Sequence, residues 1–235
     1  MIPKIVHLSW KDKDVVNSQS DLIKNGLRNL IDLNPDWRVE ISTDAEVDAY
    51  LKDQLGEDYA LVEDAGIVAK TDIWRLIKLF NEGGLYIDID RFCNVKLSDL
   101  INDQIKWVLP TCADMDFSHD FMMTAPGNPA YANTIALYLQ RRKEGHTNIY
   151  FLGAQTYMHG VTYTLYGEMI NTDPGVEAFQ KIRERLAQIP FIRTYRETPP
   201  YDTLVYQGDV STESWEAMKR GFYAESGVKH WTGEW

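Results

Sequence analysis

Residues 69–90 read AKTDIWRLIKLFNEGGLYIDID, and this stretch decides the fold. Its apolar residues cover most of the circumference of a helix expected over roughly residues 64–82, which predicts a helix buried nearly all round. Gly83 and Gly84 then end the helix, because glycine readily takes the left-handed conformation found at helix C-termini. Residues 85–90 predict a buried strand whose two aspartates, two positions apart, share one face.

Strand and helix patterns alternate along the first 90 residues. The expected strands cover 2–9, 37–41 and 85–90, and the expected helices cover 21–33, 44–55 and 64–82. This alternation predicts an α/β fold with a largely parallel central sheet flanked by helices. Farther along, we expect strands at 106–110 and 121–125, helices at 128–142, 154–170 and 176–188, and an irregular or short-stranded tail. No repeat, linker or composition break divides the chain, so residues 1–235 are predicted to form a single domain.

Composition excludes several classes of function. The chain has 24 Lys and Arg against 35 Asp and Glu, a formal net charge of −11, and no basic stripe, which argues against nucleic-acid binding. Two cysteines without C-x-x-C spacing predict neither a disulfide framework nor a zinc ribbon. No run approaches the about 18 apolar residues of a membrane span, and no signal peptide is recognisable. We therefore expect a cytoplasmic protein.

Asp88 and Asp90 come at the end of a predicted parallel strand, the edge of such a sheet where ligands bind. Paired carboxylates at this place can hold a hard divalent cation, directly or through water, and the cation can neutralise a diphosphate. Two solvated aspartates at a turn are the alternative interpretation.

Asp72 and Arg75 fall inside the apolar sector of the preceding helix. Charged side chains seldom face a core unless they are paired or bind something. Two interpretations are therefore open for these two residues. They form a purely structural ion pair, or they bind a ligand.

Five stretches carry a resemblance to a known family: IPKIVHLSW at 2–10, NPDW at 34–37, the 69–90 segment, APGNP at 125–129 and HWTGEW at 230–235. Together, and in this order, they resemble the glycosyltransferases containing a DXD sugar-binding region. That family includes fungal α-1,6-mannosyltransferases, capsular-polysaccharide sugar transferases and, more distantly, clostridial glucosylating toxins. The resemblance covers the whole length of the chain.

The resemblance implies a single Rossmann-like domain of the GT-A type. It also implies transfer of a sugar, with retention, from a nucleotide-diphosphate sugar to a carbohydrate acceptor hydroxyl, with a UDP-sugar favoured and a GDP-sugar possible. The implied donor-binding residues are His7, Leu8, Trp10, Thr71, Asp72, Arg75, Tyr86, Asp88 and Trp235. The implied catalytic residues are Asp88, Asp90 and Arg75, and the implied ligands of Mn²⁺ (or Mg²⁺) are Asp90, His230 and, directly or through water, Asp88.

Three alternatives stay open. An inverting enzyme would need a carboxylate base, for which Asp114, Asp116 or Asp120 could serve. A phosphatase of the haloacid-dehalogenase type also places D-x-D at a strand end, although Phe92 departs from its motif. A nucleotide-sugar-binding module without catalysis is the third, and the two intact aspartates argue against it.

Overall fold

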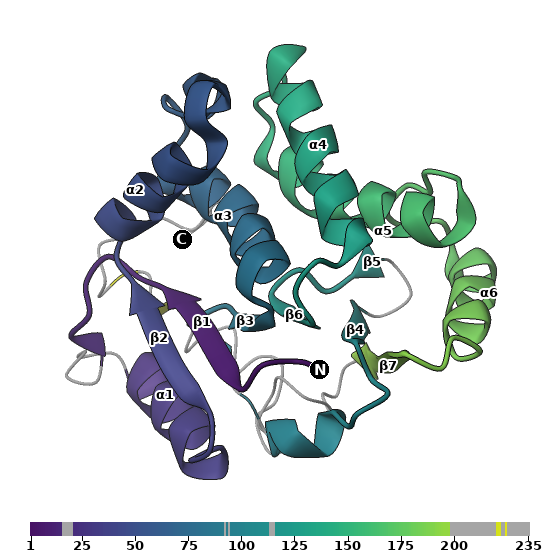
Figure 1. The fold of residues 1–235 in the computed structure, drawn as a ribbon, viewed down its shortest axis with the longest axis horizontal. Coiled ribbons are helices and arrows are strands. Elements are labelled where there is room, and N and C mark those ends of the chain that lie inside the picture. The colour runs from purple at the N-terminus through teal and green to yellow at the C-terminus, as the bar shows by residue number, and fades with distance from the viewer. Residues whose placement is uncertain are drawn as a thin grey trace.

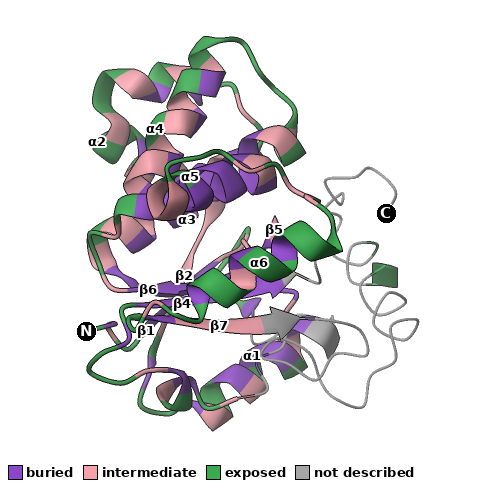
Figure 2. Cartoon of the chain, turned by 90° about the vertical axis from the view of Figure 1, so that its right-hand side faces the viewer, coloured by how far each residue is buried: buried purple, intermediate pink, exposed green. Residues whose placement is uncertain are grey.

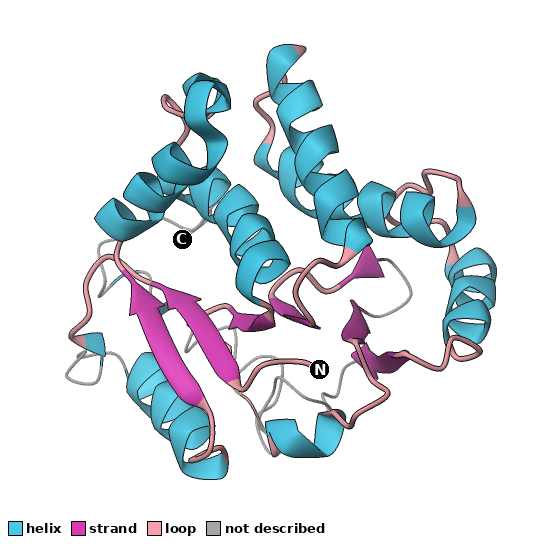
Figure 3. Cartoon of the chain, in the orientation of Figure 1, coloured by secondary structure: helices cyan, strands magenta, loops and turns pink. Residues whose placement is uncertain are grey.

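The computed structural model describes residues 1–15, 21–91, 93, 95–112, 116–197, 220–221 and 224. Over this part of the chain, helices cover both faces of one seven-stranded sheet (Figure 1). The secondary structure follows the expected alternation of strands and helices (Figure 3). The α/β fold class, with helices flanking a central sheet, is thereby confirmed.

The strands are β1 (Ile5–Ser9), β2 (Arg38–Ser42), β3 (Gly84–Ile87), β4 (Trp107–Cys112), β5 (Asp116–Phe117), β6 (Phe121–Thr124) and β7 (Ile192–Glu197). The helices are α1 (Asp21–Leu33), α2 (Asp44–Leu55), α3 (Ile67–Glu82), α4 (Pro129–Lys143), α5 (Thr156–Tyr166) and α6 (Val176–Leu186). Three short elements, unexpected from the sequence, are the 3-10 turns η2 (Gly56–Leu61) and η3 (Leu97–Leu100) and the π-helical turn η4 (Phe151–Gln155). The π-helical turn occupies the start of the helix expected at 154–170.

The sheet has the strand order β2-β1-β3-β6-β4-β5, and β7, which lies outside this order, also pairs with β4. β1 is parallel to both β2 and β3, and β7 is parallel to β4. β6 runs antiparallel to β3 and β4, and β5 runs antiparallel to β4, so the sheet is more mixed than expected. The cause is the short connection after β4, because a parallel return requires a crossover of about a dozen residues or more.

Each face of the sheet has its own apolar core. Alternate strand residues point to opposite faces, so Tyr86 packs on the side of α3 while Leu85 and Ile87 pack on the side of α1. Figure 2 shows α3 and α5 on one side of the sheet and α1 on the other. The α3 face carries the larger aromatic cluster, which includes Trp74 and Tyr131.

The junction between α3 and β3 requires glycine. Gly83 and Gly84 have φ values of 68° and 95°, which only glycine adopts without strain. A Cβ atom at Gly84 would lie 2.5 Å from the carbonyl oxygen of Ile5, so a larger residue would push β3 away from β1. The glycine stop predicted from the sequence is confirmed.

The two aspartates of the D-x-D motif follow β3 and are not part of it. The strand ends at Ile87, and Asp88 begins a turn in which the Arg91 amide donates to the Asp88 carbonyl at 3.0 Å. The Asp88 amide donates to the carbonyl of Asp120 at 2.9 Å. The expectation that both aspartates lie on one strand face was therefore wrong, because the chain turns where pairing with β6 ends.

Candidate active site

Two opposite charges lie buried in the middle of α3. Asp72 is 6% exposed and Arg75 is 5% exposed, and the Arg75 Nη2 atom lies 2.8 Å from Asp72 Oδ1. Nearly all residues from Ala69 to Leu79 are buried, so these two charges are largely shielded from solvent. Their burial, predicted from the helix pattern, is confirmed.

Arg75 also reaches beyond its own helix. Its Nη1 atom donates to the carbonyl of His119 at 2.7 Å and lies 3.4 Å from Asp88 Oδ1. Its guanidinium carbon lies 4.3 Å from the centroid of the Tyr86 ring. One side chain thus connects α3, the turn after β3 and the segment between β5 and β6, so the pair with Asp72 is only part of a larger network.

Tyr86 fixes the position of Asp88. The Tyr86 hydroxyl donates to Asp88 Oδ1 at 2.5 Å, and burial raises the pKa of Tyr86 well above its ordinary value, so the hydroxyl stays protonated. Burial also raises the pKa of Asp88, and the carboxylates of Asp90 and Asp120 raise it further against the opposing charge of Arg75. The turn therefore gathers negative charge that a cation would stabilise.

The remaining acids near this turn differ in their partners. Asp90 is 5% exposed, and Asp120 forms an ion pair with Arg91. Burial, followed by repulsion from Asp120, raises the pKa of Asp116 to about 7. The pKa of His119 is lowered by burial and then by the charge of Arg75, which favours a neutral imidazole.

These residues fit a hard divalent cation in chemical character, since carboxylate oxygens are the ligands such ions prefer. The carboxylates of Asp90 and Asp120 repel the carboxylate of Asp88. Together with burial, this repulsion raises the pKa of Asp88. His230, Trp235 and Asp114 fall outside the described residues, so their predicted roles stay predictions.

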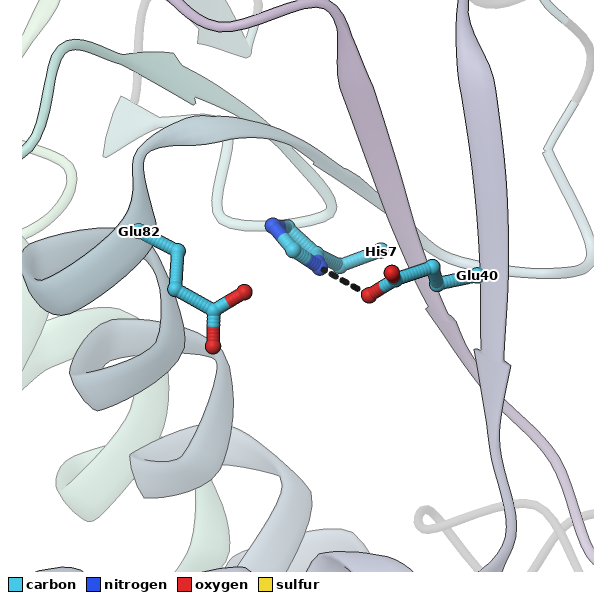
Figure 4. Close-up of side chains that lie close together, drawn as sticks. All are labelled: His7, Glu40 and Glu82. Carbon is cyan, nitrogen blue, oxygen red and sulfur yellow. Dashed lines mark ion pairs between the residues drawn. The ribbon is translucent and has the colours of Figure 1, made fainter.

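The predicted residues of the first strand lie in three environments. His7 is 1% exposed and faces Glu40 of β2 (Figure 4), whereas Leu8 is 2% exposed and packs in the core beside α1. Trp10 follows β1 and is half-buried, with its amide donating to the Ser42 carbonyl at 2.9 Å.

The structure brings five of the predicted site residues into one network: Thr71, Asp72, Arg75, Tyr86 and Asp88. In it the Thr71 carbonyl accepts from Arg75 Nε at 3.4 Å.

Sequence reasoning missed two participants. The carbonyl of His119 accepts from Arg75, and a backbone acceptor leaves no sequence signal. Gly153, in the π-helical turn, comes so close to α3 that a Cβ atom there would lie 2.8 Å from Asp72 Oδ2. Gly153 lies one residue before the helix expected at 154–170, so no sequence pattern pointed to this contact.

The D-x-D turn lies in a part of the chain that resembles a glycosyltransferase family. Residues 20–107, somewhat more than a third of the chain, match the family described as "Glycosyltransferase sugar-binding region containing DXD motif". The matched part contains α3, β3 and the Asp88–Asp90 turn, so the resemblance predicted from the sequence is confirmed.

Curated relatives with named activities are fungal. Inositol phosphoceramide mannosyltransferase 1 of Schizosaccharomyces pombe is 23% identical over 129 residues, 54% of this chain and 40% of the relative. Mannosyl phosphorylinositol ceramide synthase SUR1 of Saccharomyces cerevisiae is 26% identical over 136 residues, 57% of this chain and 34% of the relative. The chain thus spans well under half the length of these relatives.

A solved structure supports the fold over nearly the whole chain. The PaToxG glycosyltransferase superposes with a TM-score of 0.55, covering 96% of this chain and 87% of that one, at 15% sequence identity. Among the described residues, no helix is both long and apolar enough to cross a membrane.

Proposed function

We propose that this chain transfers a sugar from a nucleotide-diphosphate sugar to a hydroxyl of a glycan or glycoconjugate acceptor. The observation that carries the proposal is the position of Arg75, which is buried between Asp72 and Asp88 at the D-x-D turn. A buried cation surrounded by acids beside a strand end suits recognition of a polar, doubly charged donor. The match of this same segment to the DXD family supports the assignment.

Each residue of the network has a role in this proposal. Arg75 directs its guanidinium toward the donor diphosphate, and Asp72 accepts hydrogen bonds from hydroxyls of the transferred sugar. Asp88 binds the ribose, while Trp10, after β1, stacks on the base. Tyr86 and the His119 carbonyl hold Asp88 and Arg75 in place before the donor arrives.

The leaving diphosphate requires positive charge in addition to Arg75. Asp90, with Asp88 directly or through water and with His230, would hold Mn²⁺ or Mg²⁺. Such an ion supplies Lewis-acid stabilisation of negative charge on the leaving group. Without it, the diphosphate would meet Asp72, Asp88 and Asp90 in a chain whose formal net charge is −11.

The stereochemical course proposed is retention, as the family resemblance implies. The structure supplies a specific observation for the alternative, inversion. Asp116 has a pKa raised to about 7, which suits a general base at neutral pH, whereas Asp120 is held by Arg91. The anomeric configuration of the product distinguishes the two courses.

The sugar to test first is mannose, because the curated relatives are named for mannosyl transfer. The experiment incubates the protein with UDP- and GDP-sugars and Mn²⁺, measures free nucleotide diphosphate, and follows the anomeric protons of the product. We expect release with one sugar nucleotide that stops in EDTA, and that falls in Asp72→Asn while the variant stays folded.

Two results would contradict the proposal. Hydrolysis of p-nitrophenyl phosphate without any sugar-nucleotide turnover would favour the phosphatase. Tight binding of a sugar nucleotide with neither release nor transfer would favour a binding module.

A further inference from the structure

His7 has a fixed orientation in the sheet. It lies on β1, in register with Glu40 on β2 and Tyr86 on β3, and is 1% exposed. Its Nε2 atom lies 3.0 Å from the carbonyl oxygen of Gly83. A carbonyl can only accept, so Nε2 carries the hydrogen, and Nδ1 of the neutral ring presents a lone pair.

That lone pair has no hydrogen-bond donor among the described residues. The Nδ1 atom of His7 is buried and unpartnered, and it lies 3.8 Å from Glu40 Oε2. Burial lowers the pKa of His7, which favours the neutral ring. A neutral nitrogen lone pair that faces a carboxylate oxygen gains nothing from it, so the arrangement lacks an electropositive partner.

Glu82, the last residue of α3, supplies a second carboxylate (Figure 4). One ligand atom each from His7, Glu40 and Glu82 lie within 4.8 Å of one another. The site is also at the C-terminal end of α3, where the carbonyl groups of the helix favour a cation. Glu40 and Glu82 are partly exposed, so an ion and its water ligands have access.

Two neighbouring cations do not fill this place. Arg38 binds Glu40 through Oε1 at 3.0 Å, and Lys78 binds Glu82 through Oε1 at 2.5 Å. Each carboxylate keeps its second oxygen, and in Glu40 this is the oxygen that faces His7. The charges of Arg38 and Lys78 weaken the attraction for a further cation, but each of them pairs with only one oxygen of its glutamate.

We propose that His7, Glu40 and Glu82 bind a divalent transition-metal ion, with zinc as the best fit, at a site separate from the D-x-D turn. Imidazole nitrogen with two carboxylates suits zinc better than calcium or magnesium, which prefer oxygen alone. The hydrogen bond from Nε2 to the Gly83 carbonyl is the outer-shell contact that orients metal-binding histidines. The ion would connect β1, β2 and the end of α3.

The geometry requires only small movements. Zinc bonds to nitrogen and oxygen of about 2.0–2.2 Å place tetrahedral ligands about 3.3–3.6 Å apart. The present spacing of up to 4.8 Å therefore closes by rotation of the glutamate side chains, which are the exposed members of the site. The buried imidazole stays in place.

The experiment uses the full chain, stripped of metal and carrying Asp88→Asn and Asp90→Asn to remove the other candidate cation site. Zinc ion is titrated by calorimetry and thermal unfolding, and nitrogen NMR follows the His7 ring. We expect one equivalent of zinc to bind, to shift the Nδ1 resonance of His7 and to raise the melting temperature. Adding Glu40→Gln and Glu82→Gln should weaken zinc binding about tenfold or more.

Glu144→Gln is the matched control, since Glu144 Oε2 lies 3.6 Å from the exposed ring of His146, and the described residues supply no third ligand there. This variant should bind zinc like its parent. Zinc binding that is unchanged by the Glu40 and Glu82 substitutions would overturn the proposal. The proposal would also be overturned if the His7 ring resonance shifted with pH but not with zinc. The group between His7 and Glu40 would then be a shared proton and not a metal ion.

Discussion

The guanidinium of Arg75 lies over the ring of Tyr86, 4.3 Å from its centroid, while its nitrogen atoms face Asp72 on one side and Asp88 on the other. A stacked and doubly paired arginine cannot move without breaking several contacts. Arg75 therefore connects the stability of α3 to the position of the D-x-D turn, and variants of this network should affect both.

Replacing Arg75 by methionine should destabilise the protein by about 3–5 kcal/mol, because the buried carboxylate of Asp72 loses its partner. Urea unfolding measures the change. The double variant with Asp72→Asn should recover part of the loss. Lys181→Met, which breaks the exposed pair with Glu177, is the control and should change stability by less than about 1 kcal/mol. A loss for Arg75→Met as small as this control would contradict the interpretation.

Asp90→Asn should leave the fold intact and lower Mn²⁺-dependent turnover by two or more orders of magnitude, about 2.7 kcal/mol of barrier or more. The reason is that a ligand charge disappears at nearly constant volume at a buried position. Nucleotide release against Mn²⁺ concentration is the measurement, with Asp103→Asn, an exposed aspartate, as the control. Turnover that persists in EDTA would remove the metal from the mechanism.

Trp10→Ala should weaken nucleotide binding by about 1–3 kcal/mol, the scale of base stacking on an aromatic ring. Trp10 is only half-buried after β1, and the Lys11 ammonium lies 5.9 Å from the centroid of its ring. Calorimetric titration with the free nucleotide diphosphate tests this, and Trp10→Phe should restore much of the affinity. Equal affinity in a folded Trp10→Ala variant would show that the ring serves packing alone.

Gly153→Ala tests the contact between the π-helical turn and α3. The new Cβ atom would lie 2.8 Å from Asp72 Oδ2, so either Asp72 or the turn must shift, and this disturbs the pair of Asp72 with Arg75. We expect a loss of about 1–3 kcal/mol in unfolding free energy together with weaker donor binding. Gly66→Ala is the control, because a Cβ atom there meets nothing within 4 Å. Identical losses in both variants would contradict a role for the Asp72 contact.

Asp116 should make stability depend on pH. Its pKa is about 7 in the folded chain against 3.8 ordinarily, so the folded state binds the proton more tightly. The penalty for ionisation is absent below about pH 4, grows as the pH rises, and is complete above about pH 7. Asp116→Asn should therefore be more stable than wild type by up to about 4 kcal/mol at pH 8, with little difference at pH 4.

Urea unfolding at both pH values measures this, with Asp53→Asn on the exposed face of α2 as the control. A difference that is the same at pH 4 and pH 8 would show that the carboxyl of Asp116 is not perturbed by folding.

The sequence by itself determined most of the longer elements and their order, since these depend on local patterns, whereas β5 and the three short helical turns were not expected. The double-glycine stop predicted the end of α3 at the residue where the structure has it, and the helix start expected at residue 128 lies within one residue of the start of α4. The inward position of Asp72 and Arg75 followed from the same helical period. Recognition of the D-x-D region rested on the same segment, now matched by the family.

Only the tertiary structure decided what those side chains contact. The reversal of β6, the exit of Asp88 from the sheet and the approach of Gly153 to Asp72 bring together residues far apart in the chain. The same holds for His7, whose ring meets the Gly83 carbonyl 76 positions away. Local patterns record which face of an element is apolar. They do not record which element packs against that face, because the packing depends on the shape and hydrogen bonding of the whole core.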